Sequence, residues 1–123
     1  MMDPDSISVE VPNGILFIRD PAFWDFPEPQ REGAVWANSR GICMSCMHEQ
    51  EGPTDVTVGA ASAVKGTEHL KYDGQLETPS RRALVAIVPG ETILEQKVLN
   101  TKTRVRVWTD GHPATATVII ALE

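Results

Sequence analysis

The sequence lacks the features that mark several classes of protein. Two cysteines in 123 residues are too few for a disulfide scaffold. No apolar run approaches the ~20 residues of a membrane-spanning helix, and the first residues lack the basic start and apolar stretch of a secretory signal. The 11 basic residues are outnumbered by 17 acidic ones. These absences predict a cytoplasmic protein that neither crosses a membrane nor binds nucleic acid through a basic surface.

The composition is that of one globular domain. Hydrophobic residues make up 41% of the chain, which argues against disorder of the whole sequence. A length of 123 residues supplies one hydrophobic core rather than two. We therefore expect a single domain over residues 1–123, with a formal net charge of −6.

The hydrophobic pattern mostly repeats every two residues, as in strands with one buried face. Val105 and Val107, for example, alternate with Arg104 and Arg106. Further short strands are predicted at residues 7–11, 15–18, 34–37, 41–48, 55–58, 83–88, 92–99 and 115–122. Residues 20–32 have room for at most one short helical turn. The sequence therefore predicts an all-β fold, a two-sheet antiparallel sandwich or partly closed barrel of seven to nine strands.

Two places in this pattern depend on turn residues. Pro12-Asn13-Gly14 predicts a tight hairpin between the first two strands, because Asn-Gly supplies the positive φ values of such a turn. Residues 59–80 have no clear period, and Tyr72-Asp73-Gly74-Gln75 within them is typical of a turn.

The sharpest local motif is Cys43-Met44-Ser45-Cys46, with His48 two residues later. Such a pair can form half of a zinc site or a redox pair, so Cys43, Cys46 and His48 are candidate metal ligands. No second cysteine pair exists, however, and no helix is predicted after Cys46. In a strand over residues 41–48 the two thiols would point to opposite faces and could not bind one ion. We expect two small buried thiols, no metal site and no cofactor.

No catalytic motif is present. The nucleophile elbow, the zinc-protease helix motif and the glycine loops that bind phosphate are all absent from the sequence. Asp20 with Asp25, or Glu28 with Glu32, could serve as acid and base, but acidic loop residues are usually only solvated. We predict that the protein is not an enzyme. Two alternatives stay open: a small-ligand or metal-dependent enzyme in the mouth of a β-barrel, and a structural homo-oligomer such as a homodimer.

Residues 20–32 are the most unusual segment, and we call them the acidic aromatic loop. Residues 1–32 have a net charge of −5, and five of the seven aromatic residues lie between positions 17 and 36. Prolines reduce the entropy lost on docking, aromatic rings anchor a partner, and carboxylates steer a basic one. The loop is therefore predicted to bind a protein partner through Asp20, Trp24, Asp25, Phe26, Glu28 and Glu32. In the alternative interpretation, Trp24 and Phe26 cover an open end of the sandwich.

The order of these features resembles that of the competence protein J and nuclease-inhibitor family of bacterial β-sandwich proteins. The matching positions are Gly14–Asp20, Trp24, Gly33–Trp36, Gly52, Asp55–Gly59 and Arg82–Pro89. Pro89-Gly90 stands where the family has Pro-Phe, and the family's Gly-Tyr before the last strand is missing. The resemblance implies a sandwich that binds a basic nuclease through acidic residues imitating a nucleic-acid backbone. Here those residues would be the acids of the acidic aromatic loop.

Overall fold

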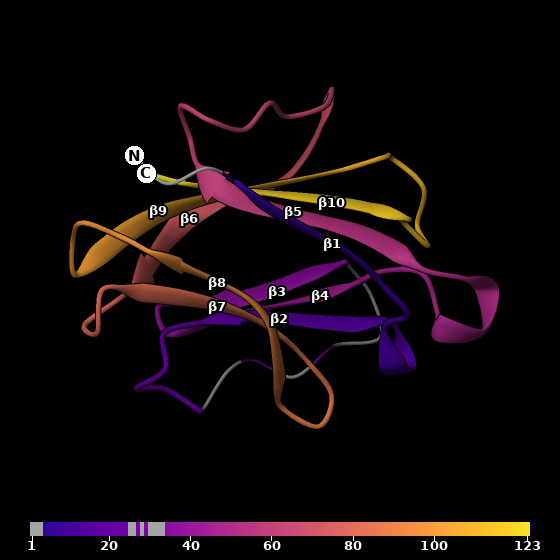
Figure 1. Cartoon of the computed structure of the whole chain (residues 1–123), viewed down its shortest axis with the longest axis horizontal. Coiled ribbons are helices and arrows are strands. Elements are labelled where there is room, and N and C mark those ends of the chain that lie inside the picture. The colour runs from indigo at the N-terminus through magenta and orange to yellow at the C-terminus, as the bar shows by residue number, and fades with distance from the viewer. Residues whose placement is uncertain (1–3, 25–26, 28, 30–33) are drawn as a thin grey trace.

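The computed structural model describes residues 4–24, 27, 29 and 34–123, which form two five-stranded sheets packed face to face (Figure 1). The first sheet has, in order, β1 (Asp5–Val9), β5 (Thr54–Ala60), β10 (Thr117–Leu122), β9 (Lys102–Thr109) and β6 (His69–Glu77). The second has β3 (Val35–Asn38), β4 (Gly41–Ser45), β2 (Ile15–Arg19), β7 (Arg82–Ile87) and β8 (Glu91–Lys97). The predicted all-β sandwich is confirmed, with ten strands in the described chain rather than seven to nine.

The core lies between the two sheets, because every second side chain of a strand points inward. Leu16 and Ile18 of β2 are fully buried there, as are Val105 and Val107 of β9. Phe17 lies between the two core residues of β2 and so points to the outer face of the second sheet. Among the described strands β5 and β10 pair in parallel, and the other pairs are antiparallel.

The first two strands do not form the predicted hairpin. β1 pairs with β5 in the first sheet, whereas β2 lies between β4 and β7 in the second. Pro12–Gly14 form a short 3-10 helix, η1, that carries the chain from one sheet to the other. Asn13 and Gly14 have the positive φ values that were predicted, but they lie in a connection between the two sheets and not in a hairpin.

The turn predicted at Tyr72–Gln75 is wrong, because these residues lie inside β6, which pairs with β9 along its length. Gly74 is needed there for space. A Cβ atom on Gly74 would collide with the Tyr72 side chain two residues earlier on the same face. A register shift between Leu70 and Tyr72 also breaks the alternation on this edge strand. Together these features removed the alternation of apolar and polar residues by which a strand is predicted.

Elsewhere, a second 3-10 helix, η2, covers Glu49–Glu51. No helix among the described residues is long and apolar enough to cross a membrane.

Substituting Gly14 by alanine is expected to lower the free energy of unfolding by about 2 kcal/mol. Gly14 has a φ of +64°, and its Cβ would lie 2.7 Å from the backbone oxygen of Cys46. That oxygen cannot easily move away, since the Cys46 N–H donates to the Gly14 carbonyl at 2.8 Å. Gly90→Ala is the matched control, because Gly90 has a φ of +134° but no atom near its Cβ position. Urea unfolding of both variants checks the prediction, and equal losses would contradict the steric part of it.

Candidate functional site

The end of β2 leads directly into the acidic aromatic loop, and the first residue of that loop is fully buried. The Asp20 side chain is 0% exposed, and its two carboxylate oxygens accept hydrogen bonds from backbone N–H groups. Ala22 donates to Oδ1 at 2.7 Å, and Ser80 donates to Oδ2 at 2.8 Å. The first bond closes a tight turn, and the second ties the loop to the chain just before β7. An exposed carboxylate that steers a partner was expected here, but this carboxylate is buried and occupied.

Arg19, the last residue of β2, is also buried, with 4% of its surface exposed. Its Nη1 donates to the carbonyl oxygen of Phe23 at 2.9 Å and to that of Asp20 at 3.3 Å. Burial lowers the pKa of Arg19, and the negative charge of Asp20 opposes that shift. Since the ordinary pKa of an arginine lies far above neutral pH, the guanidinium remains a cation there.

Trp24 rests on this cation. The guanidinium carbon of Arg19 lies 4.1 Å from the centroid of the Trp24 ring, which is a cation–π contact. The tryptophan is nevertheless 71% exposed, so its other face is open to solvent. Stacking on a buried group orients the indole before any partner arrives. The side chain therefore has the properties of an anchor residue at an interface.

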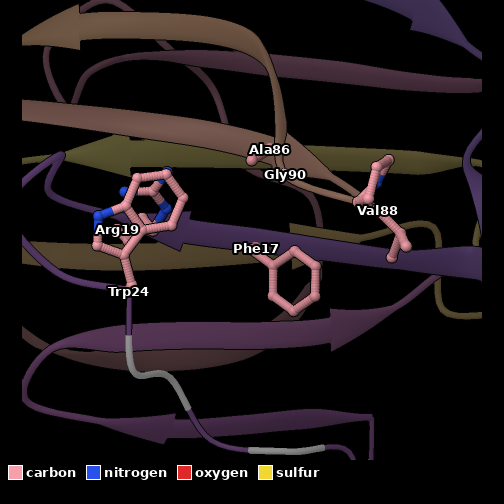
Figure 2. A pocket seen from close by; sticks show the side chains of 7 residues that line it. Phe17, Arg19, Trp24, Ala86, Val88 and Gly90 are labelled. Carbon is pink, nitrogen blue, oxygen red and sulfur yellow. The ribbon is translucent and has the colours of Figure 1, made fainter.

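A cavity of about 140 Å³ opens beside this pair. It is lined by Phe17, Arg19, Trp24, Ala86, Val88, Pro89 and Gly90. Figure 2 shows the indole stacked on Arg19, with Phe17 farther along β2 and Val88 and Gly90 on the neighbouring strand connection. The cavity wall is apolar apart from the arginine. We call these seven residues the Trp24 surface.

The remaining predicted contact residues, Asp25, Phe26, Glu28 and Glu32, lie outside the described residues. Of the six, the structure therefore places only Asp20 and Trp24, one in the interior and one on the surface. Phe23, between them, is half-buried, and Arg40 lies over its ring at 4.8 Å.

Three members of this candidate site were not predicted from the sequence: Arg19, Phe17 and the β7–β8 connection. The alternation of residues 15–19 could have indicated Phe17 and Arg19. Phe17 and Arg19 must share the face of β2 opposite to Leu16 and Ile18, so this outer face carries a ring and a cation. The approach of Val88–Gly90 depends on the pairing of β2 with β7, which the sequence pattern did not specify.

The three candidate metal ligands are kept apart by their positions in the fold. Cys46 belongs to the core cluster, whereas Cys43 lies between two core residues of β4 and faces the other side of the sheet. Both thiols are buried, and burial raises the pKa of each to about 11. The exposed His48 precedes η2, where its Nδ1 accepts a hydrogen bond from the Gln50 N–H at 3.2 Å. Within the described part of the chain no group of three such side chains is placed to hold a metal ion.

The cavities elsewhere in the described chain have other linings. One of about 600 Å³ lies where the β8–β9 turn meets the ends of β5 and β10, and none of the cysteines or histidines lines it. Leu99 at its rim is 90% exposed. Another cavity, of about 280 Å³, is lined by Lys71 and His112 among other residues.

Comparison with known proteins gives a class at the level of the fold. No protein-family model matches the sequence, and no curated protein sequence matches it. Among solved structures, the same sandwich occurs in a bacterial inhibitor of a DNA-degrading enzyme. That protein is ComJ of Bacillus subtilis, described as an inhibitor of the DNA-degrading activity of NucA. The two structures superimpose with a TM-score of 0.60 over 98% of this chain and 94% of ComJ, at 11% sequence identity. The resemblance indicated by the sequence is thus confirmed for the fold.

Proposed function

We propose that this chain is a cytoplasmic, non-enzymatic protein that binds and inhibits a basic protein partner such as a nuclease. Trp24 is the anchor of the contact, with Phe26 beside it in the sequence, and Asp25, Glu28 and Glu32 steer the partner. The observation that carries the proposal is the 71% exposed indole held on a buried guanidinium. A large ring that is exposed and already held in one orientation is suited to anchoring an interface.

Two further observations support this proposal. The fold is shared with ComJ, which is described as a nuclease inhibitor. The acidic excess is concentrated in residues 1–32, which have a net charge of −5. On the first sheet, by contrast, Arg104 and Arg106 are engaged in ion pairs with Asp73 and Glu123. The acidic excess of residues 1–32 therefore favours a basic partner.

The test is inhibition of DNA-degrading enzymes purified from cells that produce this protein, with NucA as a comparison enzyme. Trp24→Ala is expected to raise the Kd for the inhibited enzyme by about 30-fold or more, because truncating an interface anchor typically costs at least 2 kcal/mol. Leu99→Ala is the matched control, since it removes an equally conspicuous exposed side chain at a different place. Binding that survives Trp24→Ala unchanged would exclude Trp24 as the anchor.

The steering charges need a separate measurement. Affinity should fall as salt rises from about 0.05 to 0.5 M, the range in which exposed charges become screened. Asp25→Asn combined with Glu28→Gln should weaken binding and flatten this dependence. The control with the same change in charge is Glu49→Gln with Glu51→Gln in η2. Equal effects of the two pairs would show that only total charge matters. Light scattering of the free protein reports whether the Trp24 surface instead joins two copies.

A further inference from the structure

Arg19 has more hydrogen-bonding capacity than the described residues of its chain use. The guanidinium carries five N–H donors, and only Nη1 has acceptors among the described residues, the carbonyls of Asp20 and Phe23. No carboxylate of the described chain lies within ion-pair distance of it. The nearest acid in sequence, Asp20, has its oxygens bound by the N–H groups of Ala22 and Ser80. Nε and Nη2 are thus free of intramolecular acceptors within the described structure.

The same arginine lines the cavity of about 140 Å³ in the Trp24 surface. Trp24 covers one face of the guanidinium (Figure 2), and the N–H edge is the part that can form hydrogen bonds to another molecule. A planar guanidinium edge matches the two oxygens of a carboxylate, and such charge-assisted bonds strengthen in surroundings of low polarity. The other walls, among them Phe17, Val88 and Pro89, are apolar and suit an aliphatic stem.

We propose that this cavity binds a carboxylate on a short aliphatic stem, supplied by an aspartate or glutamate side chain of the protein partner. The assignment of the carboxylate to a partner rests on the function proposed above, whereas the chemistry of the cavity does not. Trp24 then provides contact area, and Arg19 discriminates between partners that have an acidic side chain at this position and partners that have a neutral one. A neutral side chain would leave the guanidinium edge desolvated and unpaired. A partner that is basic overall must therefore present one acidic group in register with Arg19.

The cavity is tested first without a partner, by NMR titration with butyrate and with its neutral analogue butyramide at constant ionic strength. Butyrate should shift the Trp24 indole N–H and the Arg19 Nε–H saturably, with a Kd on the order of 10 mM. Butyramide should bind about tenfold more weakly or not at all. The N–H signals of Trp108 and of Arg104, which lie on the other sheet, should not respond. Equal responses to the two compounds, or equal shifts at Arg104, would overturn the site.

Variants separate the site from general charge effects. Arg19→Lys keeps the cation but loses the planar edge, and should weaken butyrate binding about tenfold. Arg104→Gln removes an exposed cation elsewhere and should leave it unchanged. If Arg19→Lys does not fold, Ala86→Val fills the cavity wall instead and should abolish the butyrate response.

The partner assignment is tested by competition with the inhibited enzyme. Saturating butyrate should weaken binding of the enzyme at least fivefold, and butyramide should not. Binding of butyrate without competition would overturn the assignment to a partner. The two proposals fail separately. If butyrate does not bind, the carboxylate site is excluded, and the Trp24→Ala experiment still tests the inhibitor function. If Trp24→Ala leaves enzyme binding unchanged, the butyrate titration still tests the carboxylate site.

Discussion

Replacing Asp20 with alanine should lower the free energy of unfolding by about 2–4 kcal/mol, a large share of the stability of a small domain. The side chain is 0% exposed and accepts from two backbone N–H groups that have no alternative acceptor within the described structure. Its loss also leaves the buried Arg19 cation without the opposite charge beside it. Two N–H groups would then lose their acceptor, and Arg19 would lose a nearby negative charge.

Two controls isolate this effect in urea or thermal unfolding. Asp20→Asn keeps one carbonyl oxygen as an acceptor, so it should be clearly less destabilising than alanine. Asp73→Ala breaks an ion pair with Arg104 on the surface, where solvent screens the charges, and should have a much smaller effect. A loss for Asp20→Ala no larger than that for Asp73→Ala would show that the Asp20 hydrogen bonds contribute little.

Asp20→Ala also links the fold to the proposed site. The bond to Ser80 holds the start of the acidic aromatic loop against the chain before β7, and the turn at Ala22 sets the direction of the chain toward Trp24. Trp24 in turn lies on Arg19, whose Nη1 is bound to carbonyls of the same loop. Asp20, which was predicted to steer a partner, therefore supports Trp24, the proposed anchor.

The strands that could be predicted are those with one wet face or a fully apolar run. β7 and β9 were found because Ala83–Ile87 is continuously apolar and Val105 and Val107 alternate with arginines. β6 was not found, because Gly74 and the register shift near Leu70 interrupt its period. The local sequence pattern could not predict that β1 and β2 belong to different sheets. An Asn-Gly pair fixes the backbone at a turn but not the partner of the next strand.

The exposed Trp24 of the candidate site could be predicted from the sequence, whereas the residues that support it could not. Trp24 could be singled out because its neighbours in the sequence are acidic residues, prolines and other aromatic residues. The support depends on the arrangement of distant segments: Asp20 accepts a hydrogen bond from Ser80, and Phe17 lines the same cavity as the Val88–Gly90 connection. Such contacts follow from the antiparallel pairing of β2 with β7. Without the strand order, a buried aspartate and an exposed one look the same in sequence.

Alkaline pH should destabilise the protein by up to about 5 kcal/mol through its two thiols. Burial raises the pKa of Cys43 and of Cys46 from 9.0 to about 11 in the folded state. Between pH 9 and pH 11 the unfolded chain releases these protons while the folded chain retains them. Stability therefore falls as pH rises through this window, and below pH 9 the thiols contribute no pH dependence.

The measurement is the free energy of unfolding in urea between pH 8 and pH 11 under reducing conditions. Tyrosine and lysine also titrate there, so the double variant Cys43→Ala, Cys46→Ala serves as the reference. It should show a markedly shallower decline, and each single variant should recover about half of the difference. In the folded protein at pH 8, both thiols should react with a disulfide reagent about 100-fold more slowly than in the unfolded chain, because the thiolate is the reactive form. Parallel pH profiles for the wild type and the double variant would show that the thiols ionise as freely in the folded sandwich as in the unfolded chain.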